Sequence, residues 1–334
     1  MEEGFNKKDI IFLAGSRGMV GSAIKRKLEN LGYGKSQKEF ILLTPTRREL
    51  DLLDDISVKK WFKENKPKIV ILAAAKVGGI FANSHYPADF LIENIRIQAN
   101  VIEASFACEV KRLLFLGSSC IYPKYSSQPI QEEALLTNSL ESTNEPYAIA
   151  KIAGLKLCEA LRSQYGFDAI SLMPTNLYGP NDNYHETNSH VMAALIRKFL
   201  VAKRDNLASV TCWGSGNVHR EFLHVDDLAE AVYFCLKNWF PSKNNAPKDS
   251  LGRTLNHLNI GTGKDISIRE LAEKIAYLTN FKGNILWDTS KPDGTPKKLL
   301  DVSRINKLGW HAKINLDSGL KKTIDSLRTD MFVS

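Results

Sequence analysis

Short apolar runs alternate along the first half of the chain with longer segments of mixed polarity. The apolar runs resemble strands buried on both faces of a parallel sheet, and they cover residues 9–15, 40–43, 69–75, 113–116 and 169–173. The segments between them have helical length and spacing, and they include residues 19–31, 57–65, 88–107 and 147–165. Alternating strands and helices favour right-handed crossovers. We therefore predict a doubly wound α/β domain with a parallel sheet.

The pattern changes after Pro174, where residues 174–183 are rich in turn formers. Beyond this turn we expect helices at residues 190–203, 226–239 and 267–278, with Asp226 as the N-cap of the second. We expect strands at residues 210–213, 222–225 and 258–263, and loops at residues 241–253 and 291–296. The last of these strands is apolar and ends in glycine, so we assign it to the main sheet.

These elements predict two interleaved α/β domains. Residues 7–175 form the dinucleotide-binding domain, with return segments near 222–240 and 256–263. Residues 176–221 and 264–330 form a smaller substrate domain. We expect the substrate cleft between the two.

Composition narrows the class of protein. The chain has 334 residues, of which 43% are hydrophobic, and this suits two linked subdomains. Its net charge of +8 comes from scattered basic pairs, which favour a solvated surface over a nucleic-acid interface. The absence of an eighteen-residue apolar run argues against a membrane span. Five cysteines without a Cys-x-x-Cys pair indicate reduced thiols and a cytoplasmic protein, and the seven histidines show no metal-ligand spacing, so we expect no metal.

A glycine-rich turn lies between the first predicted strand and the first predicted helix. Gly15, Gly18 and Gly21 have the spacing that permits a tight turn and a close approach of the backbone to a pyrophosphate. The following helix directs its partial positive charge at the phosphates. This turn predicts a dinucleotide site.

The end of the second predicted strand favours NADP over NAD. An NAD site normally has a carboxylate there for the ribose 2′-hydroxyl, but no acid occurs before Glu49. Arg17 lies within the glycine turn, and Arg47 and Arg48 follow the second strand. Guanidinium groups bind a 2′-phosphate well, so we predict Arg17 as its anchor, assisted by Arg47 or Arg48.

Candidate catalytic groups follow the fourth strand and begin the helix after it. Tyr147 and Lys151 are four residues apart, on one helix face, where an ammonium can stabilise a phenolate whose pKa is ordinarily about 10. Ser118 can polarise the same carbonyl oxygen, and Cys120 shares its face if the segment is extended. The sequence therefore predicts acid–base chemistry at a carbonyl group.

The chain resembles the extended short-chain dehydrogenase/reductase family and, within it, the GDP-L-fucose synthase family. The resemblance covers nearly the whole chain and rests on residues 15–22, 73–79, 116–123, 144–151, 173–180, 213–216, 220–227 and 291–296. It implies a Rossmann domain that binds NADP(H). It also implies 3,5-epimerisation and 4-reduction of GDP-4-dehydro-6-deoxy-D-mannose, with Cys120 as base and His190, in the segment 187–190, as acid.

The resemblance further implies the residues of the site. Those expected to bind the cofactor are Gly15, Ser16, Arg17, Gly18, Met19, Val20, Gly21, Leu116, Gly117, Ser118, Ser119, Lys151, Pro174, Thr175, Asn176, Leu177 and His190. Those expected to bind the substrate are Lys198, Arg220 and Lys298 for the pyrophosphate and Trp213 near the nucleotide. Position 198 holds Lys where some relatives have Arg.

Two other functions remain open, and so does the oligomeric state. A nucleotide-sugar 4-epimerase or 4,6-dehydratase could use the same scaffold, although Cys120 and the missing acid favour the reductase. A redox-sensing or scaffold protein that binds NADP without turnover would usually lose Tyr147 or Lys151. The family implies a homodimer formed by the helices at 88–107 and 147–165, but the sequence could equally bury them within one chain.

Overall fold

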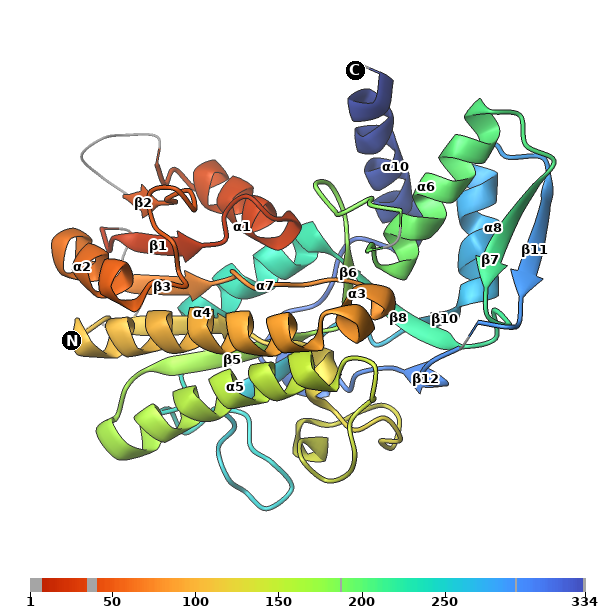
Figure 1. Ribbon diagram of the computed structural model, residues 1–334. Helices are drawn as coiled ribbons and strands as arrows, with labels where there is room; N and C mark the ends of the chain where they lie inside the picture. The colour runs from red at the N-terminus through yellow and green to blue at the C-terminus, as the bar shows by residue number, and fades with distance from the viewer. Residues whose placement is uncertain (1–7, 35–40, 187, 292, 333–334) are drawn as a thin grey trace.

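The computed structural model describes residues 8–34, 41–186, 188–291 and 293–332. Lys7, Phe40, Thr187 and Pro292, which the sequence analysis places in a domain, a strand or a motif, lie outside these ranges. The described chain forms a larger lobe around one wide sheet and a smaller lobe beside it (Figure 1).

The larger lobe is built on a six-stranded sheet in which all neighbouring strands are parallel. Its order is β2 (Leu42–Leu43), β1 (Ile11–Ala14), β3 (Ile69–Leu72), β4 (Arg112–Leu116), β5 (Ala169–Pro174) and β9 (His257–Ile260). Strands β1, β3, β4, β5 and β9 are buried along their whole length, because helices cover both faces. The predicted doubly wound sheet and its late strand are confirmed.

Helices pack on the sheet in two layers. On one face α4 (Pro87–Ala107) lies along α5 (Glu145–Tyr165), with α2 (Asp55–Asn65) beside α4 (Figure 1). On the other face α1 (Met19–Asn30) packs against α7 (Val225–Asn238). The strand order reverses between β1 and β3, which is the place where doubly wound folds bind ligands.

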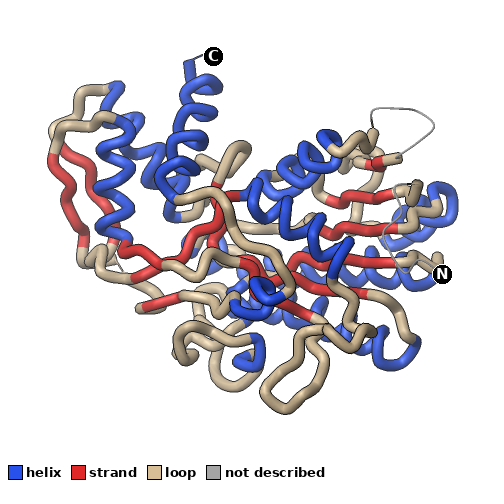
Figure 2. The backbone as a smooth tube through the Cα atoms, turned by 180° about the vertical axis from the view of Figure 1, so that it is seen from behind, coloured by secondary structure: helices blue, strands red, loops and turns tan. Residues whose placement is uncertain are grey.

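The smaller lobe has its own hydrophobic core. Its main sheet contains β8 (His219–His224), flanked by β10 (Asp265–Ser267), β12 (Lys297–Lys298) and β6 (Asn176–Tyr178). A parallel ribbon of β7 (Ser209–Trp213) and β11 (Asn284–Asp288) lies at the far edge, seen from behind in Figure 2. Its helices are α6 (Val191–Arg204), α8 (Ile268–Thr279) and α10 (Leu316–Phe332).

Short elements complete the chain. They are α3 (Ile80–His85), α9 (Ser303–Lys307) and two 3₁₀ turns, η1 (Ser119–Ile121) and η2 (Glu132–Ala134). Among the described residues, every helix is too short or too polar to cross a membrane.

Two local predictions differ from the structure. His224, and not Asp226, is the N-cap of α7, because its Nδ1 atom accepts a 3.2 Å hydrogen bond from the Asp226 N–H. Leu300, Ile305 and Trp310 pack in the core of the larger lobe, although the sequence analysis assigns residues 264–330 to the substrate domain. The chain therefore crosses back to the larger lobe once more than we expect from the sequence.

Candidate active site

The glycine turn forms one end of a cavity of about 760 Å³ at the strand-order reversal. Gly15 has φ +86°, and a Cβ atom on it would lie 2.7 Å from the Ala74 backbone. A Cβ atom on Gly21 would collide with the Gly15 carbonyl group. Gly18 precedes α1, whose first N–H groups therefore face the cavity without a side-chain cap. This cradle fits the pyrophosphate of a dinucleotide.

The charged residues that line this cavity bear on the choice between NADP and NAD. Arg17, Thr46 and Arg47 line the cavity, whereas Arg48 does not. The Glu49 carboxylate accepts a 2.6 Å hydrogen bond from the Thr46 N–H, so it closes the local turn. Asp51 also lines the cavity, and its Oδ2 atom lies 3.7 Å from Arg47 Nε. Arg17 and Arg47 are thus the predicted arginines that line this cavity, together with Lys76, which is paired with Asp89 and Glu93.

A second cavity of about 220 Å³ opens from the first, since Met19, Val20 and His190 line both. It lies at the carboxyl ends of β4 and β5, under the start of α5. The residues predicted to be catalytic all line it, namely Ser118, Cys120, Tyr147, Lys151 and His190. The cofactor residues predicted outside the glycine turn line it as well, namely Leu116, Gly117, Ser118, Ser119, Lys151, Pro174, Thr175, Asn176, Leu177 and His190.

Tyr147 and Lys151 occupy the predicted helix face, but their electrostatics differ from the prediction. Lys151 Nζ donates a 2.8 Å hydrogen bond to the Leu116 carbonyl oxygen and lies 5.9 Å from the centre of the Tyr147 ring. Burial lowers the pKa of Lys151 to about 7. Burial, and then the nearby Cys120 charge, raises the pKa of Tyr147, and the hydrogen bond with Ser118 lowers it by less. Tyr147 is therefore held as a neutral phenol, which suits a proton donor.

Cys120 lies in a tight turn. The sequence analysis expects an extended segment, but residues Ser119–Ile121 form a 3₁₀ turn whose cap, Ser118, accepts a 3.2 Å hydrogen bond from Cys120 N. The Cys120 sulfur is half-buried, and it lies 3.5 Å from Asn144 Nδ2 and 3.8 Å from Lys298 Nζ. Both Ser118 and Cys120 still face one cavity, because the turn begins at the end of β4.

His190 precedes α6 and lies where the two cavities meet. Its ring reaches solvent, while the protein atoms crowded around it lower its pKa from the usual value. Gly79 N donates a 3.1 Å hydrogen bond to the Asn188 carbonyl oxygen, and a Cβ atom on Gly79 would collide with the Ser189 carbonyl group. The loop after β3 thus fixes the segment that ends at His190.

The predicted substrate residues lie in the smaller lobe, outside the lining of both cavities. Lys198 Nζ lies 5.6 Å from the centre of the exposed Trp213 ring. Arg220 and Lys298 are paired neighbours on β8 and β12. Asp293 lies beside Arg220: its carboxylate binds Ser215, and its carbonyl oxygen accepts a 3.4 Å hydrogen bond from Arg220. Arg220 and Lys298 form a cationic pair beside Cys120, whereas Lys198 and Trp213 lie together on α6 and β7.

Sequence reasoning missed Asn144 as a functional residue. It lines the second cavity and contacts the Cys120 sulfur. Its place immediately before α5, three residues before Tyr147, is the signal that could have identified it. In the described part of the chain, no group of three or more His, Cys, Asp or Glu side chains could hold a metal ion.

Comparisons with known proteins agree with this site. The model of the NAD dependent epimerase/dehydratase family matches residues 11–249. "GDP-L-fucose synthase 1" of Arabidopsis thaliana is 53% identical, over 96% of this chain and 93% of that protein. "GDP-L-fucose synthase" of Escherichia coli K12 is 52% identical, over 95% of each. The solved structure of a GDP-mannoheptose C4 reductase from Campylobacter jejuni with NADP bound is 37% identical, with a TM-score of 0.85, over 97% of this chain and 100% of that one.

Proposed function

The chain belongs to the NAD dependent epimerase/dehydratase family, and we propose that it converts GDP-4-dehydro-6-deoxy-D-mannose to GDP-L-fucose. The reaction is a 3,5-epimerisation followed by an NADPH-dependent reduction at C4. One observation carries the proposal: a phenol, an alcohol, a thiol and an imidazole, from Tyr147, Ser118, Cys120 and His190, line one cavity. Relatives more than 50% identical over nearly their whole length bear the name GDP-L-fucose synthase.

NADP(H) is the cofactor, and the residues present fit it. The Gly15–Gly21 cradle holds the pyrophosphate, and Arg17 and Arg47 take the 2′-phosphate. Lys151, Thr175 and Leu177 line the cavity that receives the nicotinamide end. When bound, NADPH supplies the hydride for C4.

Epimerisation needs a base and an acid beside the sugar. The ketone at C4 acidifies the hydrogens at C3 and C5, so that a thiolate can remove one of them. Cys120 is this base, and the imidazole of His190 returns a proton. Tyr147 and Ser118 hold the C4 oxygen while negative charge gathers on it, and one such donor is worth about 3 kcal/mol.

Reduction uses the same donors. Tyr147 gives its proton to the C4 oxygen as the alcohol forms, which agrees with a phenol kept neutral by burial. Lys151, buried between β4 and α5, keeps Tyr147 in place and binds the nicotinamide ribose. The side chains of Lys198, Arg220 and Lys298 bind the pyrophosphate of the substrate, and Trp213 packs against its nucleotide.

A 4-epimerase or 4,6-dehydratase on this scaffold has less support. UDP-glucose 4-epimerases share the fold at 22% identity, which shows the fold alone. The thiol of Cys120 beside the phenol of Tyr147 has no task in a simple exchange of hydride at C4. Turnover is favoured over a non-catalytic role because both Tyr147 and Lys151 are present and line the cavity.

We also propose an oligomeric state and a cellular location for the protein. Ile92, Ile95 and Ile149 are exposed on the adjoining helices α4 and α5, and these helices form a homodimer in which a second copy covers them. Residues 7–175, with the later β9 and α7, act as the cofactor domain, and the smaller lobe acts as the substrate domain. All five cysteines are free, which suits the reducing cytoplasm.

The direct assay mixes purified protein with NADPH and GDP-4-dehydro-6-deoxy-D-mannose and follows the absorbance of the reduced cofactor. Stoichiometric NADPH oxidation with formation of GDP-L-fucose supports the proposal. Cofactor binding without oxidation would indicate a non-catalytic protein, and a changed sugar without oxidation would indicate an epimerase or dehydratase.

A further inference from the structure

Two hydrogen-bond donors lie beside the sulfur of Cys120. Asn144 Nδ2 lies 3.5 Å and Lys298 Nζ 3.8 Å from the Cys120 sulfur. We propose that Asn144 and Lys298 are positioning residues that hold Cys120 as the thiolate which removes the C–H proton. This inference rests on the proposed function, and it gives Lys298 a second task besides the pyrophosphate.

Lys298 is fixed by its strand and is not a free surface lysine. Its strand, β12, lies beside β8, with Lys298 opposite Arg220. The next two residues are held on both sides, because Leu299 N donates to Gln128 Oε1 at 2.8 Å and Leu300 N donates to Glu221 Oε2 at 2.9 Å. Glu221 is itself fully buried. The backbone under Lys298 therefore has one position relative to Cys120.

Buried hydrogen bonds also fix the turn that carries Cys120. Tyr122, two residues later, donates a 2.6 Å hydrogen bond to Asn259 Oδ1. Asn259 Nδ2 donates in turn to the carbonyl oxygens of Ile130 at 2.9 Å and Asp301 at 3.2 Å. One fully buried amide thus joins the cysteine turn to the segment that follows Lys298.

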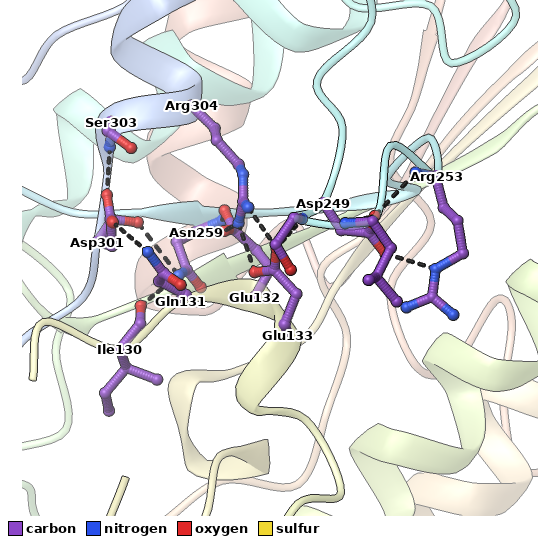
Figure 3. A network of polar contacts seen from close by, with 12 residues as sticks. Ile130, Gln131, Glu132, Glu133, Asp249, Arg253, Asn259, Asp301, Ser303 and Arg304 are labelled. Carbon is purple, nitrogen blue, oxygen red and sulfur yellow. Dashed lines mark hydrogen bonds and ion pairs between the residues drawn. The ribbon is translucent and has the colours of Figure 1, made fainter. Parts of the chain in front are cut away.

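Ion pairs lie beside Asn259. Figure 3 shows Arg304 reaching from α9 to Glu132 and Glu133, with Asn259 beside them. Glu132 Oε1 accepts a 3.0 Å hydrogen bond from Asn259 N. Glu132 is 1% exposed, so these partners are ordered by burial and charge together. The arrangement keeps the sulfur and the ammonium close before any substrate arrives.

Asn144 completes the pair from the other side of the sulfur. It precedes α5 and lines the catalytic cavity. Its Oδ1 atom is buried and has no hydrogen-bond partner in the described part of the chain.

Charged and polar groups face Cys120 from several elements. Lys298 from β12 and Arg220 from β8 are cationic, and the Tyr147 phenol from α5 is kept neutral by burial. Two acids lie close to Arg220: Asp293, whose carboxylate binds Ser215, and Glu141, which has its own cation in Lys124, 3.6 Å away. A nearby ammonium and an N–H donor stabilise a thiolate over a thiol, which is the form that accepts a proton.

Alkylation of Cys120 by iodoacetamide tests this without any substrate, because the thiolate attacks carbon and iodide leaves. The rate is followed at Cys120 by peptide mass spectrometry from pH 5.5 to 9.5 on protein with NADP bound. In Lys298→Met we expect the rate at pH 7 to fall about tenfold and the half-maximal pH to rise by about one unit. In Asn144→Ala we expect a fall of about threefold. Lys298→Arg should stay within about twofold of the parent protein.

The control is Lys297→Met, which removes the neighbouring lysine of β12, an ion-pair partner of Asp265 at 3.1 Å. It should leave the Cys120 profile unchanged, and NADPH binding should survive in all four variants. The parent protein also tests the proposal if a variant fails to fold, because Cys108 is a second half-buried thiol. Cys120 should reach its half-maximal rate at a pH at least about one unit below that of Cys108.

Unchanged Cys120 profiles in folded Lys298→Met and Asn144→Ala would overturn the proposal, and so would equal profiles for Cys120 and Cys108. These outcomes do not depend on turnover. A protein that fails to make GDP-L-fucose but shows the shifted alkylation would refute the proposed function and leave the thiolate site standing.

Discussion

The ammonium group of Lys151 points at the Leu116 carbonyl oxygen, 2.8 Å away, and its partner is thus the end of β4 and not the Tyr147 phenol. Lys151 is 4% exposed, and burial lowers its pKa to about 7. The helix α5 is thereby bonded to the sheet at the catalytic cavity, which both Lys151 and Leu116 line. Because Lys151 is buried, its protonation has a measurable effect on the free energy of unfolding.

Stability without cofactor should therefore rise with pH. Because the unfolded lysine has a pKa of about 10.4 and the folded one is lower, the unfolded chain binds more protons between these values. The folded protein consequently gains stability from pH 7 towards pH 10. In Lys151→Met this gain should shrink by about 1 kcal/mol per pH unit between pH 7 and 9. Urea unfolding of both proteins at each pH measures it, and equal slopes would contradict the buried, weakly basic lysine.

Removing the phenol should separate the two chemical steps. In Tyr147→Phe the reduction should fall by about 10²–10⁴-fold, because no other group gives a proton to the C4 oxygen. The rate of solvent deuterium exchange into the sugar should fall less, since Ser118 still donates a hydrogen bond to the C4 oxygen. NADPH oxidation and NMR of the sugar measure the two rates. An equal loss of both would show that Tyr147 serves binding more than proton donation.

Cofactor preference should depend on Arg17 and Arg47. Both line the cofactor cavity, whereas Arg48 does not. The double variant Arg17→Ala/Arg47→Ala should raise the KM for NADPH by at least about tenfold, since a charge-assisted contact contributes about 1.5–3 kcal/mol. The KM for NADH should change little, and Arg48→Ala is the matched control. If NADPH and NADH lose affinity equally, the two arginines do not recognise the 2′-phosphate.

The exposed face of α4 and α5 should control assembly. Ile149→Asp places a charge on the proposed interface, which also contains Ile92 and Ile95, and should convert a dimer into a monomer. Light scattering during size-exclusion chromatography gives the mass directly. Ile56→Asp is the control, because Ile56 is 78% exposed and belongs to α2, not to α4 or α5. A monomeric parent protein, or a variant that stays dimeric, would refute this interface.

Sequence patterns predicted the elements whose burial is local and continuous. Strands β1, β3, β4 and β5 are short apolar runs buried along their whole length, so a period is unnecessary to recognise them. The strands β6, β10 and β12 were not predicted, because two or three partly polar residues become a strand only through pairing with β8. The cap of α7 was misplaced because a histidine is a rare substitute for Asp or Ser at that position.

The site was predictable where motifs supply the residues and unpredictable where distant segments meet. Gly15, Ser118 and Tyr147 belong to motifs, and each lines the expected cavity. Lys298 meets Cys120, which lies 178 positions earlier in the chain, only because β12 pairs with β8. Pairings of this range leave no local pattern in the sequence.

The most direct test of the account runs the complete reaction in D₂O. The protein, NADPH and GDP-4-dehydro-6-deoxy-D-mannose should yield GDP-L-fucose with solvent deuterium at both C3 and C5, and Cys120→Ser should bind NADPH but make almost none of this product. A reduced sugar with no deuterium at these carbons, or unchanged product formation by Cys120→Ser, would contradict the claim that one cavity carries out both epimerisation and reduction.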